Sequence, residues 1–209
     1  MGSFCHLHLH TEYSLLDGAI RITELASRLK EMGMTSCAIT DHGVMYGAVS
    51  FYKAMESAGI HPVIGCEVYV APASRFDKDP ASYQHERYYH HLILLAKDNT
   101  GLVHLNKLVS AGFTEGFYRR PRIDEELLGK YHEGLICLSG CVAGKLPGLI
   151  LAGDIDGAKR CAEKYDALFG RGNYYLEIQS NQLPEQAKVN QHLIMLSNET
   201  GIPLVATND

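Results

Sequence analysis

Hydrophobic positions along the chain form short apolar runs separated by stretches with helical spacing. The runs are typical of β-strands and lie at about residues 4–10, 36–41, 62–71, 91–97, 134–139, 174–179 and 204–209. Most gaps between them carry a helical pattern, clearest in four sets: Ile22, Leu25, Ala26 and Leu29; Leu102, Leu105, Leu108 and Val109; Ala158, Ala162, Tyr165 and Phe169; Ala187, Leu193, Ile194 and Leu196. Glycines follow the predicted helices where a C-terminal cap is expected, at Gly33, Gly59, Gly170 and Gly201.

This alternation of strands and helices predicts an α/β fold with a parallel sheet covered by helices. Seven repeats fit either a closed or nearly closed barrel or an open doubly wound sheet. The chain has 209 residues and neither a low-complexity linker nor a solenoid repeat. We therefore expect one domain spanning residues 1–209.

One segment, residues 72–89, interrupts the rhythm. It contains charges, two prolines and little periodicity. The pattern indicates a long excursion between two strands, either a lid over a site or a solvated loop.

Composition narrows the function classes. The formal net charge of -5 disfavours a broad basic face for duplex DNA. No apolar run approaches the roughly 20 residues that span a bilayer, and the N-terminus lacks a signal-peptide pattern, so we expect a soluble cytoplasmic protein without membrane contact. The six cysteines form no CxxC pair and are expected to be reduced.

Side chains that bind metals or transfer protons gather at the predicted strand ends. His6, His8 and His10 alternate along one strand, which puts all three on one face. Further candidates at the other strands are Thr40, Asp41, His42, Glu67, His90, His91, Ser139, Gly140, Cys141, Glu177 and Asp209. In parallel α/β folds the carboxyl ends of the strands form the active site, so these groups are predicted to converge.

Converging imidazoles, carboxylates and one thiolate would be costly to bury without a cation. The mixture of nitrogen, oxygen and sulfur suits Zn²⁺, with Mn²⁺ or Fe²⁺ as alternatives. More than four ligands are available, so we expect two or three ions, bridged most naturally by Glu67. Asp17 is either a helix cap or a ligand, Cys141 either a ligand or a small buried hydrophobe, and Tyr13 and Ser14 either site groups or turn residues. The remaining histidines are expected to be ordinary: His61, His85, His104, His132 and His192.

The segments HLHLHTEYSLLDG, TDHG, GCE, HLILLAKD, EGFYRRPRID, LSGC, LEIQ, LPEQ and ATND, in this order, resemble one family across essentially the whole chain. They are similar to the N-terminal polymerase-and-histidinol-phosphatase (PHP) domain of bacterial replicative DNA polymerase III alpha subunits. The resemblance implies a distorted (β/α)7 barrel, related to the TIM barrel, with a metal cluster at the C-terminal ends of the strands. It also implies that the domain has been excised from a much longer polymerase chain.

The resemblance further implies a ligand set. His8, His10, Glu67 and Asp209 would hold a first metal; Glu67, His91 and Cys141 a second; and Asp17 and His42 a third. The family pattern ATNDxHY adds a histidine two residues after Asp209, beyond the end of this sequence. Alignment to HLxLLAKD favours His91 over His90. His6 and Asp41 are expected to support the ligands rather than bind metal.

The implied activity is metal-dependent phosphoester hydrolysis, as a proofreading 3′-5′ exonuclease on single-stranded or frayed DNA 3′ ends in the bacterial replication machinery. The catalytic set would comprise Glu67, His8, His10, His91 and Asp209, with the rest of the polymerase and a separate proofreading subunit as partners. Arg119, Arg120 and Arg122 are candidate DNA contacts, although a solvated face or a contact to the polymerase explains them equally. Two alternatives are a catalytically silent, metal-stabilised scaffold and a small-molecule phosphatase of the histidinol-phosphate type; SLLDG, EGFYRRPRID and LPEQ argue against the latter.

Overall fold

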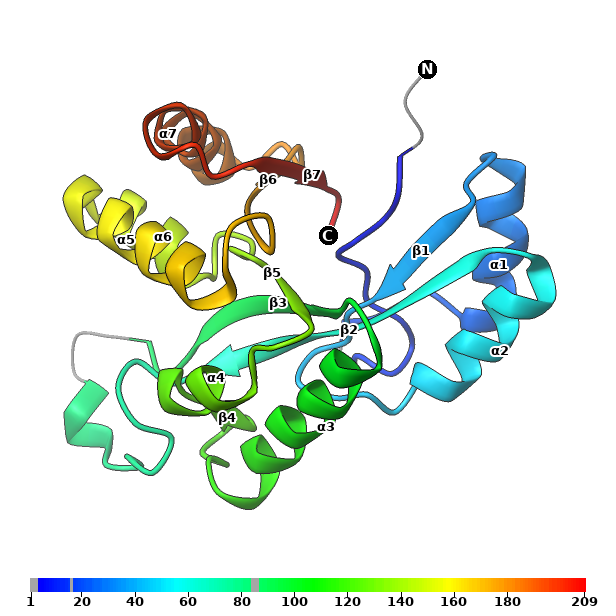
Figure 1. Cartoon of the computed structure of the whole chain (residues 1–209), viewed down its shortest axis with the longest axis horizontal. Helices are drawn as coiled ribbons and strands as arrows, with labels where there is room; N and C mark the ends of the chain where they lie inside the picture. Colours follow the sequence, from blue (N-terminus) through cyan, green and yellow to red (C-terminus); the bar gives the residue numbers. More distant parts are fainter. Residues whose placement is uncertain (1–3, 16, 84–86) are drawn as a thin grey trace.

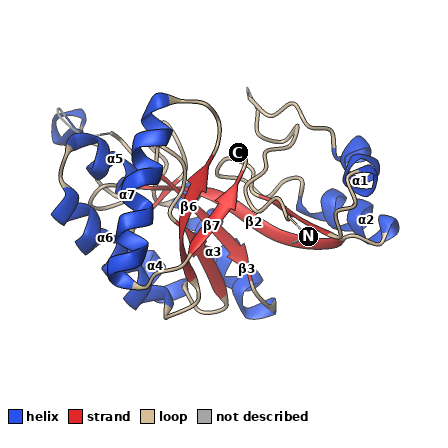
Figure 2. Cartoon of the chain, turned by 90° about the horizontal axis from the view of Figure 1, so that it is seen from above, coloured by secondary structure: helices blue, strands red, loops and turns tan. Residues whose placement is uncertain are grey.

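The computed structural model describes residues 4–15, 17–83 and 87–209, and these form one curled mixed sheet with helices packed outside it (Figures 1 and 2). The strands are β1 (Ser36–Ile39), β2 (His61–Val70), β3 (His90–Ala96), β4 (Arg122–Ile123), β5 (Leu135–Leu138), β6 (Tyr174–Gln179) and β7 (Leu204–Thr207). The helices are α1 (Ile22–Glu31), α2 (Ala48–Ala58), α3 (Asn99–Thr114), α4 (Glu125–Tyr131), α5 (Lys145–Ala152), α6 (Ile155–Phe169) and α7 (Pro184–Thr200), with a 3-10 turn η1 (Pro80–Tyr83).

The strand order is β1-β2-β3-β5-β6-β7, and β4 pairs only with β2. Among the described residues β1 and β7 do not pair with each other, so the sheet curls into a half-barrel. Six of the seven expected strands are confirmed, and the two-residue β4 is an addition. The fold class is confirmed as α/β of the distorted-barrel kind.

The expected all-parallel sheet is wrong at β3, which runs antiparallel to both β2 and β5. A parallel return needs a crossover, usually a helix, but the excursion at 72–89 contains only the short η1 in its described part. The chain therefore doubles back beside β2. As a result His91, at the start of β3, lies opposite Tyr69 near the end of β2.

The expected strand at residues 4–10 is an extended segment with a single bridge, between His6 and Cys37. Its backbone still follows β1, because Ala38 donates to the His6 carbonyl and Thr40 to the Leu9 carbonyl. The Leu9 N–H, however, bonds the Thr40 hydroxyl instead of a backbone carbonyl, so no regular ladder forms.

Three apolar clusters hold these layers together. The largest joins β2, β3, β5 and β6 to α3, α5, α6 and α7; a second packs α1 and α2 on β1; a small third one, Ala38, Ile93, Leu95 and Leu138, fills the inner face of the curl. The four predicted helices are confirmed. In α7, however, the buried face contains Gln186 and Val189 with Leu193 and Leu196, whereas Ala187 and Ile194 are exposed.

Candidate metal centre

Three overlapping groups of possible metal ligands lie at one rim of the sheet. Within the described part of the chain, the ligand atoms of each group lie within 4.8 Å of one another: His8, His10 and Asp209; His10, His42 and Glu67; Glu67, His91 and Cys141. His10 and Glu67 each belong to two groups. The groups therefore form one continuous cluster rather than three separate sites.

Glu67, in the middle of β2, stands at the centre of the cluster and is fully buried. Its Oε1 lies 2.8 Å from His91 Nδ1 and 3.5 Å from His8 Nε2, and its Oε2 lies 3.4 Å from His10 Nε2. Burial by itself raises the pKa of Glu67, but the facing His42, His8 and His91 rings lower that pKa well below its usual value. The surrounding rings therefore favour the charged carboxylate, whose Oε1 faces His8 and His91 and whose Oε2 faces His10 and His42.

His8 and His10 are each fixed through the ring nitrogen that faces away from the cluster. His8 Nδ1 donates to Glu177 Oε1 at 2.7 Å. His10 Nδ1 lies 3.0 Å from the Ser14 hydroxyl, which itself donates to Asp41, so the hydroxyl oxygen accepts from His10. When these rings are neutral, Nε2 of each carries the lone pair.

Those two Nε2 atoms lie only 3.1 Å apart, and both are near Asp209 Oδ1, at 3.5 Å for His8 and 3.2 Å for His10. Two lone pairs this close repel unless a cation, either a proton or a metal ion, lies between them. Burial lowers the pKa of His8, but the Glu177 and Glu67 carboxylates raise it well above the usual value. The position therefore favours positive charge.

The surroundings of His42 also fit a bound cation. Its Nδ1 lies 2.5 Å from Glu67 Oε2, yet neither buried atom has a hydrogen bond of acceptable geometry. On the other side of the ring, Nε2 lies 3.0 Å from Asp17 Oδ2. His42 therefore faces a carboxylate at each ring nitrogen but forms no well-oriented hydrogen bond with Glu67 among the described residues. This arrangement fits a metal ion shared by His42 and Glu67.

His91 and Cys141 complete the cluster, and His90 does not. Cys141 Sγ lies 4.0 Å from His91 Nδ1, and burial together with Glu67 raises the pKa of the thiol to about 12. His90 points to the other side of β3, into a small cavity with Lys145 and Tyr165, where burial first and then Lys145 lower its pKa to about 4. Alternation along β3 therefore presents His91 to the cluster.

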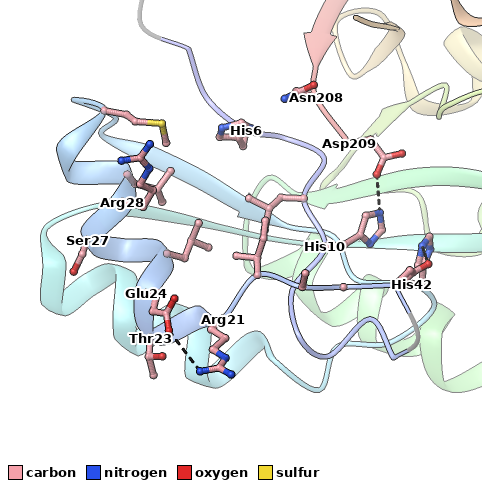
Figure 3. A pocket seen from close by; sticks show the side chains of 18 of the residues that line it. His6, His10, Arg21, Thr23, Glu24, Ser27, Arg28, His42, Asn208 and Asp209 are labelled. Atoms are coloured by element: carbon pink, nitrogen blue, oxygen red, sulfur yellow. Dashed lines mark ion pairs between the residues drawn. The ribbon is translucent and has the colours of Figure 1, made fainter. Parts of the chain in front are cut away.

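Nitrogen, oxygen and sulfur donors with orphaned polar atoms fit a divalent ion. The cluster opens into a cavity of about 1150 Å³ that reaches α1 and is also lined by His10, His42 and Asp209 (Figure 3). On the far wall of this cavity Arg21 pairs with Glu24 at 3.7 Å. A ligand much larger than a metal ion can therefore approach from this side.

Several supporting residues lie behind the ligands. Glu177, noted from the sequence but given no role, is fully buried and also accepts from the Gly140 N–H and from Gln179 and Thr207. Gln179 and Thr207 were missed; their only signal is their position at the ends of the LEIQ and ATND strands. Asp41 supports His10 through Ser14, so Ser14 is a site group rather than only a turn residue.

The remaining histidines take no part in the three groups. His6 lines the cavity, its buried Nδ1 has no hydrogen-bond partner among the described residues, and burial lowers its pKa. His61, His104, His132 and His192 are also outside the groups, and His85 lies outside the described residues.

The three arginines of FYRRPRID occupy different environments. Arg122 as a DNA contact is wrong: it is fully buried, and its guanidinium donates to the Tyr83 hydroxyl and to the carbonyls of Gly116, Arg75, Asp77 and Tyr88. It anchors the 72–89 excursion to the body of the protein. Arg119 and Arg120 are exposed and line a second, smaller cleft beside His42 and His91.

Comparison with known families agrees with this geometry. The family model of the PHP domain matches residues 6–181. The chain belongs to the PHP domain family. It is 50% identical to the DNA polymerase III subunit alpha of Treponema pallidum and 47% identical to that of Borreliella burgdorferi, each time over 99% of this chain. In both cases it spans only 18% of the relative's length.

Solved structures support the fold of this PHP domain. A candidate metal-dependent phosphoesterase from Bifidobacterium adolescentis superposes with a TM-score of 0.56 at 14% identity, covering 99% of this chain and 87% of the other. At this identity the likeness establishes the PHP-type fold alone. In the described part of the PHP domain, no helix combines the length and apolar character needed to cross a membrane.

Proposed function

We propose that this PHP domain is a multinuclear metal-dependent phosphoesterase within a bacterial replicative DNA polymerase III alpha subunit, and that it removes nucleotides from DNA 3′ ends as a 3′-5′ exonuclease. The observation that supports it most directly is the fully buried Glu67 carboxylate, whose Oε1 faces His8 and His91 and whose Oε2 faces His10 and His42. Similarity to polymerase III alpha subunits supplies the DNA context.

In this proposal His8, His10, Glu67 and Asp209 hold one metal, Glu67, His91 and Cys141 a second, and Asp17 and His42 a third. Zn²⁺ suits the sulfur and nitrogen donors best, with Mn²⁺ or Fe²⁺ as alternatives. Bound ions of this kind would polarise phosphoryl oxygens, lower the pKa of water toward neutrality and stabilise the leaving oxygen.

The chain's own contribution is orientation and charge. Glu177 and Ser14 fix the ring orientations of His8 and His10, so that both Nε2 atoms face one point. Glu67 neutralises positive charge at the centre, and the cavity beside Asp209 admits the substrate. Residues 1–209 would act as one domain of a cytoplasmic replication complex, with the rest of the polymerase and a separate proofreading subunit as partners.

The decisive test compares the metal-loaded protein with its Glu67→Gln variant. Hydrolysis of bis-p-nitrophenyl phosphate and of a 5′-labelled oligonucleotide should stop with chelator and fall more than about 100-fold in the variant, the scale of losing a charge essential to the transition state. Glu185→Gln, an exposed change on α7, is the matched control and should keep full activity. Equal cleavage by Glu67→Gln would instead reveal a contaminating nuclease.

The second candidate is a metal-stabilised scaffold without turnover. It is favoured by the small share of its relatives' length that this chain spans, because the remainder can carry the polymerase chemistry. A protein that binds two or three ions by elemental analysis, yet cleaves neither substrate, would establish the scaffold and overturn the enzyme.

A further inference from the structure

A second cleft of about 320 Å³ adjoins the metal centre and differs from it in chemistry. It shares His42 and His91 with the cluster and is also lined by Asp17, but its other walls are mostly aromatic. Tyr46, 62% exposed, and Phe117, 50% exposed, stand at its mouth. Exposed aromatic side chains that gather around one cleft, rather than being scattered singly, are typical of a ligand-binding groove.

The aromatic groups continue from the cluster outward. The His42 ring stacks near Tyr69 at a centroid distance of 6.1 Å, Tyr69 meets Tyr89 at 4.7 Å, and Tyr89 stacks near His91 at 5.9 Å. On the outer wall Phe113 and Phe117 lie 6.2 Å apart with nearly parallel rings. A flat ring that enters this cleft therefore finds π-faces between the solvent and the candidate metal ligands.

The cleft also carries positive charge, unusual in a protein of net charge -5. Among the residues that the structure describes, Arg119 and Arg120 are the only Lys or Arg residues that line it, and both are exposed, whereas neighbouring Arg122 is buried. The Arg119 guanidinium lies 4.1 Å from the Tyr88 ring centroid and that of Arg120 lies 5.7 Å from Tyr69. Arg119 has φ 62, a costly backbone conformation for a non-glycine residue.

We propose that this aromatic cleft binds the terminal nucleoside of an unpaired polynucleotide, with the base stacked on Phe117 and Tyr46 and a phosphate paired with Arg120. The inference rests on the proposed function, because it places the scissile end beside His42 and His91. Ligand pockets start at about 300 Å³, so the cleft accommodates one nucleoside and not a duplex end. Stacking on aromatic faces with a nearby arginine is how single strands are bound without base-specific contacts.

Binding can be followed by fluorescence, because the chain has no tryptophan and an introduced one is the only tryptophan that emits. Chelator treatment keeps this measurement independent of turnover. Phe117→Trp introduces a single reporter at the cleft, and its emission is followed while oligothymidylate is added to the chelator-treated protein. The matched control is Phe76→Trp: Phe76 is 57% exposed and lies against an arginine, Arg75, but is outside the cleft. Stacking should quench the reporter at position 117 and leave the reporter at position 76 unchanged.

Further binding measurements test which part of the nucleic acid the cleft recognises. An oligonucleotide with an abasic 3′ terminus should bind about 5- to 150-fold more weakly, the range expected for one lost stacked base. Arg120→Ala should reduce the salt dependence of binding by about 0.7 in log–log slope, the value for one phosphate of a single strand. Arg160→Ala on α6 should not. Oligouridylate and thymidine monophosphate tell whether DNA, RNA or a free nucleotide is preferred.

Quenching at both positions, or equal binding of the abasic strand, would overturn the inference. Its failure is distinguishable from failure of the proposed function. If the reporter at position 117 is not quenched but Glu67-dependent hydrolysis of the small phosphodiester is intact, the cleft does not bind the nucleoside and the proposed phosphoesterase function still stands. If quenching is specific to position 117 but neither substrate is hydrolysed, the exonuclease proposal is wrong and the cleft remains a nucleotide-binding site.

Discussion

At the scale of single residues, the orientation of the candidate metal ligands depends on hydrogen-bonding groups that lie behind them. Glu177 fixes His8, and Ser14, itself held by Asp41, fixes His10. Each support determines which ring nitrogen carries the proton, and so which nitrogen is free for a cation. The same fully buried Glu177 joins β6 to the Gly140 backbone and to Thr207 in β7.

The first prediction concerns this support. Glu177→Gln keeps the size of the side chain but removes the charge that orients His8 and stabilises its Nδ1–H. We expect metal affinity to fall about 10- to 100-fold, as for other lost supports of ligating histidines. A competition titration with a chromophoric chelator measures it, with Glu185→Gln as control. Unchanged affinity would mean that His8 is oriented by its packing alone.

At the scale of elements, the connection between β2 and β3 brings His91 to the rim that carries Glu67. The reversed β3 presents His91 from its amino end beside the carboxyl half of β2, which carries Glu67. The excursion that makes this reversal possible is pinned by Arg122 and by Arg75, whose guanidinium pairs with the Asp124 carboxylate at 3.0 Å. Buried arginine contacts of this kind fix geometry that no local sequence pattern specifies.

A second prediction tests how tightly α3 docks on the sheet. Gly101, in the first turn of α3, has no room for a side chain, because an added Cβ would lie 1.8 Å from the Gly134 carbonyl oxygen. Gly101→Ala should therefore lower the free energy of unfolding by at least about 2 kcal/mol, despite the better helix propensity of alanine.

Gly129 in α4 provides the matched control, because nothing lies within 4 Å of its added Cβ. Gly129→Ala should raise the free energy of unfolding by about 0.5–1 kcal/mol. Urea denaturation of both variants gives the comparison. If the two substitutions shift stability in the same direction, the close contact between residues 101 and 134 does not limit the docking of α3.

At the scale of the whole molecule, the candidate metal centre brings together residues from the two opposite edges of the curled sheet. His8 and His10 come from the N-terminal segment along β1, and Asp209 follows β7 at the opposite edge of the sheet (Figure 1). Within the described residues these edges share no strand pairing. A bound cation would hold them together.

The third prediction follows from this connection. Chelation should lower the melting temperature by about 5–10 °C, because a ligand present at 100 times its Kd stabilises a protein by about 2.7 kcal/mol. The double variant His8→Ala, His10→Ala should hold fewer ions by elemental analysis and respond less to chelator in calorimetry. Identical melting of wild-type protein with and without chelator would show that the cluster binds no stabilising metal.

Local patterns in the sequence predicted most of the elements because they record burial on nearby faces. Short apolar runs predicted six of the strands, and apolar spacing of three and four residues predicted the helices, since buried strands and helix faces leave these patterns in the sequence. The predictions were wrong at positions where a residue far away in the sequence determines the hydrogen bonding or the burial. The Thr40 hydroxyl replaces a ladder bond at Leu9, and α7 buries Gln186 instead of Ala187.

The sequence by itself determined which side chains could bind metal, because their types and spacings at strand ends are readable without coordinates. Only the tertiary structure decided which of them meet. It reversed β3, brought His91 rather than His90 to Glu67, gave Glu177 its role behind His8, and buried Arg122 while leaving Arg119 and Arg120 exposed. The physical reason is that strand direction and burial are set by contacts between residues far apart in the chain, whereas periodicity reports only on neighbours.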